Sequence, residues 1–352
     1  MTVFGGAPVS PDIDLRAVRS WMDAAGLGSG CLVDVEALTG GTQNLMAAFV
    51  RDGRRYVLRR GPSHLRAGSN AALGREMTLL DALGRTEVPH ARLVASCEDE
   101  TVLAGAAFYL MEPVDGYNPA VALPRGYAET PETRHRLGLG VVEALARLGE
   151  VDHEAVGLAG FGRPDGFLER QVPRWISELE SYSELDAYPG PDIGDVARVA
   201  RWLERHRPGR WDPGIMHGDF HVANVMARHD APEVAAIVDW EMTTIGDPLL
   251  DLGWMLSLWA APGDDADLAG SLYSQHPGRP TEQELVAHYA ERSSRDVSAI
   301  DWYVVLACFK LGIVLEGTYA RSLAGLAPVE TGLRLHDVTR RLVERALMRM
   351  ES

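Results

Sequence analysis

The polar loop within residues 214–241, read as GIMHGDFHVANVMARHDAPEVAAIVDWE, constrains this chain more than any other stretch. Apolar runs precede the loop, leave it and return after a short connection, which predicts short strands joined by tight turns. Such strands would hold Asp219, Asn224 and Asp239 on backbone with little freedom. Two carboxylates and a carboxamide offer the oxygen ligands that Mg²⁺ prefers. The stretch therefore predicts a magnesium site with Asn224 and Asp239 as ligands.

The order and spacing of these three residues also indicate a reaction. Four residues separate Asp219 from Asn224, and Asp239 follows a predicted hairpin, as in the phosphoryl-transfer site of kinases. Transfer to an alcohol needs a group that accepts the hydroxyl proton. We therefore interpret Asp219 as the catalytic base. The alternatives are a turn-forming Asp219 and a solvent-facing Asp239, but the apolar neighbours of Asp239 favour a covered site.

Two histidines flank the predicted base. His217 and His221 are more consistent with a supporting role, in which the imidazole bonds loop backbone, than with catalysis. They do not indicate a zinc site either, because the neighbouring ligands are oxygens and cysteines are absent from the stretch.

Composition limits the class of protein. A chain of 352 residues exceeds the usual size of one domain and predicts two lobes. With 46% hydrophobic and 24% charged residues, it is typical of a soluble globular protein. A formal charge of −16 argues against a nucleic-acid partner. No uninterrupted apolar run has the length of a membrane span, so no membrane partner is expected.

Cysteine usage and the first residues predict a cytoplasmic location. Three cysteines without metal-ligand spacing indicate reduced thiols. The first fourteen residues, MTVFGGAPVSPDID, have neither a basic start nor an apolar core of the kind that directs export.

Hydrophobic periodicity predicts an N-terminal lobe that contains a five-stranded antiparallel sheet with one helix on it, preceded by an N-terminal helix. The strongest local signal is Asp52-Gly53, which predicts a tight hairpin turn. The expected helices are 11–25 and 70–83, and the expected strands are 32–38, 45–51, 54–59, 92–97 and 106–111. The sequence after residue 111 breaks the pattern, which predicts lobes at 1–113 and 114–352.

The second lobe is expected to be mainly helical, so the fold class is α+β. Thr130-Pro131 predicts the start of one helix, because Pro fits the first helical position. Thr281 and Glu284 have capping-box spacing ahead of an apolar residue. Apolar periodicity predicts two more helices, at 302–323 and 333–350.

HGDFHVANVM followed by IVDWE resembles the aminoglycoside phosphotransferase and choline kinase-like group, which are relatives of the protein kinases. The segments LTGGTQNLMAAFV, YVLRRGP, REMTLLDAL, FYLMEPVDG and WEMTTIGDPLLDLGWML resemble kinase-like proteins associated with acyl-CoA dehydrogenases. The resemblance implies a bilobal kinase fold that binds ATP or GTP with Mg²⁺ and phosphorylates a hydroxyl of a small molecule. Either a monomer or a homodimer is consistent with it.

The resemblance also implies roles in the first lobe. Arg59 occupies the strand position where most kinases have a phosphate-binding lysine, and Glu76 matches the helix glutamate that pairs with that cation. Lys310 is the only lysine of the chain and lies far away in sequence. The alternatives are a surface arginine and a solvated glutamate.

The loop at residues 40–44 would cover the nucleotide phosphates through backbone N–H groups, by the same resemblance. Gly41, Thr42 and Asn44 are its candidate contacts. The loop lacks a full G-x-G-x-x-G pattern, and a Gly-Gly turn between two strands is the alternative.

The segment Met111-Glu112-Pro113-Val114 resembles the hinge that binds adenine, through the Glu112 carbonyl and the Val114 N–H. Asp251 resembles the helix aspartate that anchors the catalytic loop. Its alternative is a plain aspartate at a helix N-terminus.

The resemblance places the acceptor site among later helices, near residues 302–321, but the sequence does not select the small-molecule acceptor. Antibiotics, hydroxyacyl-CoA compounds and amino alcohols all fit. A nucleotide-binding pseudokinase is the main alternative function, because Arg59 replaces the usual lysine. A metal-dependent phosphohydrolase would share the carboxylates but leaves the first lobe unexplained.

Overall fold

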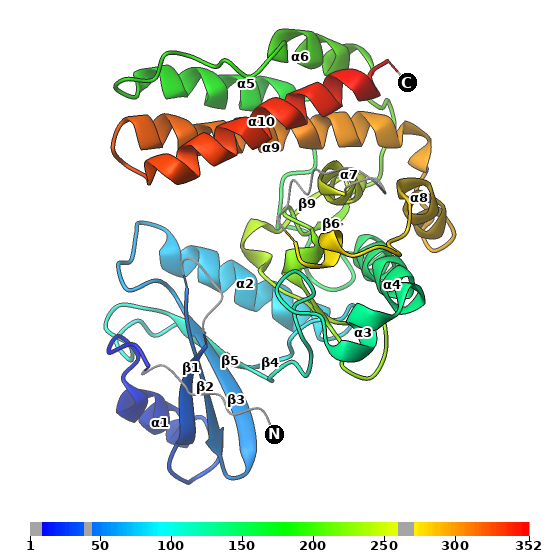
Figure 1. Cartoon of the computed structure of the whole chain (residues 1–352). Helices are drawn as coiled ribbons and strands as arrows, with labels where there is room; N and C mark the ends of the chain where they lie inside the picture. Colours follow the sequence, from blue (N-terminus) through cyan, green and yellow to red (C-terminus); the bar gives the residue numbers. More distant parts are fainter. Residues whose placement is uncertain (1–8, 39–43, 260–270, 352) are drawn as a thin grey trace. The chain divides into compact units, whose positions relative to one another are not determined.

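The computed structural model describes residues 9–38, 44–259 and 271–351 (Figure 1). The chain divides into two compact units. Unit 1 comprises Met1–Gly116, Val156–Leu158 and Ala235–Glu241, and unit 2 comprises the remaining residues. The first unit thus extends three residues past the predicted boundary and includes the segment that carries Asp239.

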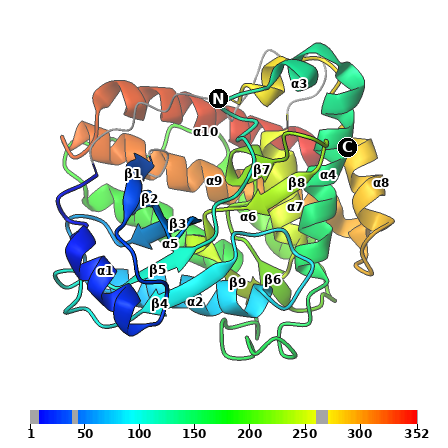
Figure 2. The ribbon, with the colours of Figure 1, turned by 90° about the horizontal axis from the view of Figure 1, so that it is seen from below.

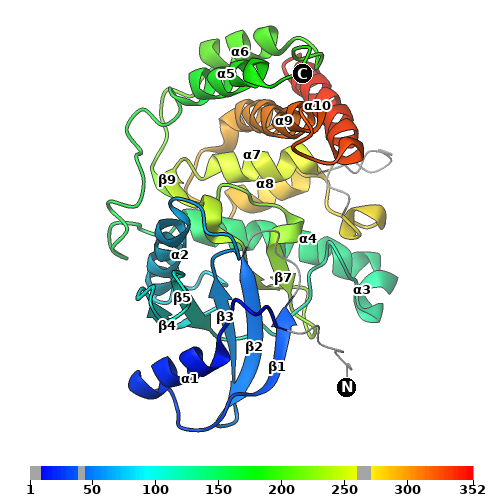
Figure 3. The ribbon, with the colours of Figure 1, turned by 90° about the vertical axis from the view of Figure 1, so that its left-hand side faces the viewer.

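Unit 1 contains the five-stranded antiparallel sheet that the sequence predicts. Its strand order is β1-β2-β3-β5-β4, and Figure 3 shows β1, β2 and β3 side by side. Asp52 and Gly53 both have positive φ, at 48° and 74°, as the tight hairpin turn requires. The elements are α1 (Leu15–Ala24), β1 (Val33–Leu38), β2 (Leu45–Arg51), β3 (Arg54–Arg60), α2 (Ser69–Leu83), β4 (Leu93–Cys97) and β5 (Phe108–Met111).

Alternation along β3 directs its side chains to opposite faces of the sheet. Tyr56 and Leu58 are buried in an apolar core that also contains Met22 of α1. Arg59 points to the other face, where it forms an ion pair with Glu76 of α2. The sheet therefore carries a helix on each face, one more than the sequence predicts for the sheet itself.

Unit 2 is mainly helical, as predicted. The capping box of Thr281 and Glu284 is confirmed, and Pro131 is the first residue of its helix. The last helix begins at Val329, four residues before the predicted start. The helices are α3 (Arg125–Glu129), α4 (Pro131–Gly149), α5 (Gln171–Ser181), α6 (Val196–Arg205), α7 (Leu249–Leu258), α8 (Glu282–Ala290), α9 (Ile300–Leu323) and α10 (Val329–Arg349).

Helix α9 is the central helix of unit 2. It packs against α7, α10, α5 and α6, and it lies beside α10 in Figures 1 and 2. The segment Val297–Leu323 is long and apolar enough to cross a membrane by composition alone, but 61% of its most apolar window is buried inside the protein. Its apolar character is therefore explained by packing, because a helix buried on all sides is apolar all round.

Short strands flank the polar loop that contains Asp219 and Asn224. β6 (Gly214–Met216) pairs with β9 (Thr244–Gly246), a partner that the sequence does not indicate. Beyond the loop, the chain continues through β7 (Val225–Ala227) and returns to unit 1 through β8 (Val234–Ile237). Asp219 and Asn224 therefore belong to unit 2, whereas Asp239 belongs to unit 1.

Candidate active site

Gly218 sets the path of the backbone immediately before the predicted base. Its φ is +87°, and a Cβ at this position would lie 2.4 Å from the carbonyl oxygen of Met242. Both the positive φ and the close approach exclude a larger residue. The peptide that leads into Asp219 is thus fixed by local geometry.

The carboxylate of Asp251 in α7 holds the same peptide from one side. Its oxygens accept hydrogen bonds from the backbone N–H groups of His217 at 2.6 Å and Gly218 at 2.8 Å. Complete burial raises the pKa of Asp251 to about 7, against the lowering effect of those two N–H groups and of Lys310. The residue lies where an anchor of the catalytic loop is expected.

Asp219 is held as an oriented carboxylate. Its Oδ1 accepts a hydrogen bond from Trp254 Nε1 at 3.0 Å, and its Oδ2 accepts one from Asn224 Nδ2 at 3.2 Å. Burial by itself would raise the pKa of Asp219, but a hydrogen bond from His221, electrostatic interactions with His221 and His217, and the Trp254 N–H outweigh burial and lower it. The carboxylate is therefore ionised near neutral pH and able to accept a proton.

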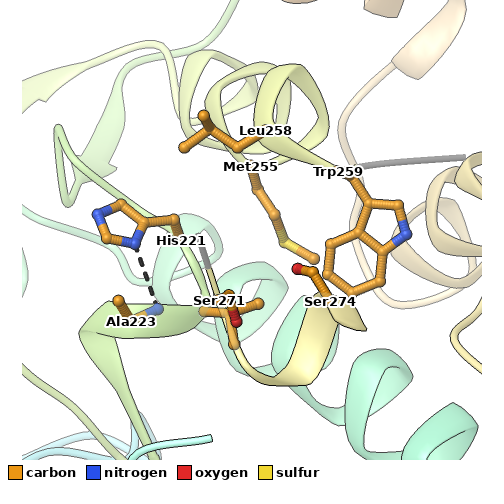
Figure 4. Close-up of a pocket in the computed structure, with 8 residues that line it drawn as sticks. His221, Ala223, Met255, Leu258, Trp259, Ser271 and Ser274 are labelled. Carbon is orange, nitrogen blue, oxygen red and sulfur yellow. Dashed lines mark hydrogen bonds between the residues drawn. The ribbon is translucent and has the colours of Figure 1, made fainter. Parts of the chain in front are cut away.

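The histidines mainly support the loop. The buried His217 accepts the backbone N–H of Asp219 at Nδ1, at 3.3 Å, and His221 accepts that of Ala223 at 3.2 Å. His221 Nε2 also lies 3.5 Å from Asp219 Oδ2. Figure 4 shows His221 at a small cavity that includes Trp259 and Ser271. His221 thus lies between the predicted base and this cavity.

In unit 1, Arg59, Glu76 and Asp239 lie together. Arg59 Nε is 3.2 Å from Glu76 Oε2, and Arg59 Nη2 is 3.4 Å from Asp239 Oδ1. Arg59 is 9% exposed and Glu76 is 5% exposed, so neither is the surface residue that the alternative interpretation requires. The hydroxyl of Tyr109 also bonds Glu76.

Burial and charge pairing act in opposite directions on this group, and burial wins at Glu76. Burial opposes the charge on Arg59, but Glu76 and Asp239 outweigh burial and raise the pKa of Arg59. Burial raises the pKa of Glu76, whereas Arg59 and Tyr109 act in the opposite direction. The guanidinium of Arg59 is therefore a positive charge that its two carboxylate partners hold in a fixed position.

Asp239 combines a strained backbone conformation with a partly exposed side chain. Its φ is +67°, a strained value for a residue other than glycine, and such strain is concentrated at functional sites. Its side chain contacts Arg59 but remains 44% exposed, so the covered position that its apolar neighbours predict is only partly found. Asn224 Nδ2 donates hydrogen bonds to the backbone carbonyl and the carboxylate of Asp219. Neither bond uses the amide oxygen of Asn224, which could bind a metal.

These oxygen donors fit Mg²⁺ chemically. Magnesium is usually held by one or two carboxylates, with waters and substrate phosphates as the other ligands. The part of the chain that the structure describes contains no group of three or more His, Cys, Asp or Glu side chains arranged for a metal. The side-chain oxygens of Asn224 and Asp239 are donors of the type that Mg²⁺ uses.

The remaining predicted nucleotide contacts are only partly described. Gly41 and Thr42 lie outside the described residues, and Asn44 immediately precedes β2. The Glu112 side chain pairs with Arg54 at 2.9 Å, and its N–H bonds a carbonyl of the neighbouring segment at 2.9 Å. Neither bond uses the Glu112 carbonyl that the hinge prediction requires. The roles of these residues, and of Val114, stay predictions.

Trp254 and Lys310 are contacts of the loop that the sequence does not reveal. Trp254 has the spacing of a core aromatic residue, yet its indole N–H bonds the predicted base. Lys310 comes from the middle of the apolar helix α9, and its Nζ lies 3.4 Å from the carbonyl oxygen of Gly218. Only the folding of α9 against α7 and the loop brings these residues to Asp219.

Comparison with known proteins identifies the family. The phosphotransferase enzyme family matches residues 34–285, which is more than half of the chain and includes the loop described above. The chain belongs to this family. This family is one of phosphotransferase enzymes, and the chain has its bilobal α+β kinase-like fold.

Relatives of this phosphotransferase include much longer proteins. It is 29% identical over 300 residues to acyl-CoA dehydrogenase family member 10 of Mus musculus, covering 83% of the chain and 27% of that protein. It is 30% identical over 311 residues to the probable acyl-CoA dehydrogenase IBR3 of Arabidopsis thaliana, covering 84% of the chain and 36% of that protein. The chain thus spans about a third of the length of these relatives.

Solved structures share its fold. A Ralstonia eutropha crystal structure, described as a candidate aminoglycoside phosphotransferase, superposes with a TM-score of 0.79 at 28% identity, covering 96% of this chain and 98% of that one. The GDP complex of aminoglycoside 2'-phosphotransferase-IIIa superposes with a TM-score of 0.61 at 17% identity, covering 94% and 99%. At that identity the second likeness concerns the fold alone.

Proposed function

We propose that this phosphotransferase is a Mg²⁺-dependent kinase that transfers the γ-phosphoryl group of ATP or GTP to a hydroxyl of a small molecule. The observation that carries the proposal is the carboxylate of Asp219, oriented by Trp254 and Asn224 and held ionised by its neighbours. A group with this geometry and charge can take the hydroxyl proton as the new bond to phosphorus forms.

The other residues have roles that follow from their chemistry. Asn224 and Asp239 would hold Mg²⁺ through side-chain oxygens. When bound, the metal neutralises charge on the phosphates. Arg59 would bind phosphate oxygens with its fork of N–H donors, and Glu76 holds that guanidinium in place.

Nucleotide recognition would use the first lobe. The Glu112 carbonyl and the Val114 N–H are the proposed adenine contacts. Gly41, Thr42 and Asn44 are the proposed contacts of the phosphate-covering loop.

The acceptor is proposed as a class. Aminoglycosides and macrolides are candidates because solved structures of similar fold carry those names. Hydroxyacyl-CoA compounds are candidates because longer relatives are named acyl-CoA dehydrogenase family members. Amino alcohols are the remaining candidate class of acceptor. A cytoplasmic location and a monomeric or homodimeric state are proposed with it.

The test is a panel of these hydroxylated compounds with Mg-ATP and Mg-GTP, using transfer of labelled phosphate as the readout. Asp219→Asn should lower turnover by about 10²- to 10⁴-fold and leave nucleotide affinity largely intact, because only the base is lost. Asp230→Asn is the matched control, since Asp230 is an exposed loop aspartate of the same unit. Turnover retained by Asp219→Asn would reject the role of the base.

A pseudokinase is the second candidate function, and Arg59 is the observation that favours it. Tight nucleotide binding without transfer to any acceptor of the panel would support this alternative. Steady nucleotide hydrolysis in the absence of every acceptor would instead indicate a phosphohydrolase.

A further inference from the structure

Lys310 is a buried cation directly beside the catalytic loop. It is 9% exposed, and its Nζ lies 4.4 Å from the ring centre of Trp254 and 5.6 Å from that of Trp175. Among the described residues, its hydrogen-bond acceptor is the carbonyl of Gly218, at 3.4 Å. Asp251 and Asp219 act on it through their charge. Burial of an ammonium group is costly, so a position with so few direct contacts calls for a reason.

The choice of lysine here is itself informative. Thirty-three of the thirty-four Lys and Arg residues are arginine, and Lys310 is the exception. Arginine needs partners that match a planar fork of donors, whereas lysine is a compact point charge. One carbonyl oxygen and the faces of two indole rings are contacts that a compact ammonium group can make.

Lys310 contacts two groups that position the predicted base, one in the backbone and one in a side chain. In the backbone, the N–H of Gly218 donates to the carboxylate of Asp251, and the carbonyl of Gly218 accepts from Lys310 Nζ. On the side-chain side, Lys310 lies on the indole of Trp254, whose N–H holds Asp219 Oδ1. One cation therefore contacts both the residue before Asp219 and the side chain that orients its carboxylate.

We infer that Lys310 is a positioning residue for phosphoryl transfer, which fixes the Gly218 peptide and the Trp254 indole so that the Asp219 carboxylate faces the acceptor hydroxyl. This inference rests on the proposed function of the same site. Lys310 acts through its neighbours and needs no contact with substrate. Displacing a reacting group by about 1 Å can cost about 10²-fold in rate, which sets the scale of the effect.

The kinetic test compares Lys310→Met and Lys310→Arg with the native protein on the acceptor that the panel identifies. Lys310→Met should lower kcat by about 10- to 100-fold and change the KM for nucleotide less than about twofold. Lys310→Arg should recover part of kcat, because it restores the charge. The matched control is Arg345→Met, since Arg345 donates to the carbonyls of Leu256 at 2.9 Å and Trp259 at 3.0 Å, contacts that do not include Asp219.

Two kinetic results would overturn the inference. One is a kcat for Lys310→Met within about twofold of the native value. The other is a loss of kcat that, like that of Arg345→Met, merely follows the loss of thermal stability. A structural role predicts the second pattern, whereas a positioning role predicts that kcat falls in protein that is still folded at the assay temperature.

A second test needs no activity, because the single lysine gives a single signal. Protein labelled with [¹³C]lysine should show a single Cε resonance, whose Hε protons are shifted upfield by the indole rings and moved by Trp254→Phe. The charged groups that face Lys310 are Asp251, Asp219 and Arg174. Because Asp219 favours the ammonium, Asp219→Asn should lower the pH at which this signal titrates.

The NMR outcome separates the two proposals. A signal at the shift of a solvent-exposed lysine, unmoved by Trp254→Phe or Asp219→Asn, would refute the placement of Lys310 even in an active kinase. A signal that responds to both substitutions supports the placement even if the protein phosphorylates no acceptor of the panel. In that case the proposed function fails while the coupling of Lys310 to the loop stands.

Discussion

The buried carboxyl of Asp251 should make stability depend on pH in a specific direction. Its pKa is raised to about 7 by burial, whereas an unfolded aspartate titrates near 3.9. Between these values the folded protein binds more protons than the unfolded chain. The stability contributed by this group is therefore complete below about pH 4 and is lost as pH rises through about 7.

The size of the effect follows from the two pKa values. Between pH 5 and pH 8, ionisation of Asp251 should lower the free energy of unfolding by about 2.5 kcal/mol. Asp251→Asn removes the titrating group and therefore removes this slope. For a unit of roughly 200 residues, 1 kcal/mol shifts Tm by about 2–4 °C, so the Tm difference between variant and native protein should change by about 5–10 °C.

The assay is thermal unfolding of both proteins at pH 5 and pH 8. The variant loses hydrogen-bond geometry to His217 and Gly218 at both pH values, an offset of about 1–3 kcal/mol that cancels in the comparison. Asp230→Asn, at an exposed position, should leave the slope near that of the native protein. Parallel Tm curves for Asp251→Asn and native protein would refute the reasoning and mean that Lys310 and the two N–H groups keep Asp251 ionised throughout.

Two further predictions concern the buried cation Arg59 and the backbone at Gly218. Arg59→Met should weaken Mg-nucleotide binding by about 10-fold or more in calorimetry and destabilise unit 1 by about 3–5 kcal/mol, since Glu76 stays buried without its partner. Arg59→Lys should keep most of the affinity, and equal losses in both variants would contradict a role for charge. Gly218→Ala should lower Tm more than Gly325→Ala, because both have positive φ but only Gly218 faces a backbone oxygen, that of Met242. Equal Tm losses would show that conformation alone matters there.

Much of the architecture could be predicted because its signals are local. Asp52-Gly53 specifies a hairpin by itself, and Thr281 with Glu284 specifies a helix start. Alternation along β3 indicates which residues share a face. Such features depend on a few neighbouring residues, so tertiary packing does not need to be known. The start of α10 at Val329 was predicted less accurately, because no capping side chain marks it.

The surroundings of the base could not be predicted, because they depend on contacts between distant segments. Lys310 lies 92 positions from Gly218, and Trp254 lies 35 from Asp219. Both belong to helices that are apolar all round, where periodicity does not distinguish one face from another. The sequence shows that a lysine interrupts an apolar helix. It does not show which residue that lysine contacts.

The buried cation of unit 1 bears on the choice between a kinase and a pseudokinase. Burying an ion pair is often no more stabilising than an apolar pair of similar size, so stability alone gives little reason to keep Arg59 and Glu76. A phosphate-binding site gives a reason, because the guanidinium then acts on a ligand. Asp239, strained in φ and still 44% exposed beside Arg59, supports the same interpretation. A protein that only bound nucleotide would use these residues equally well, but it would have no use for an ionised Asp219 oriented by an indole N–H. The separate evidence from unit 2 therefore favours the kinase, and loss of turnover in Asp219→Asn with nucleotide binding retained is the result that only the kinase predicts.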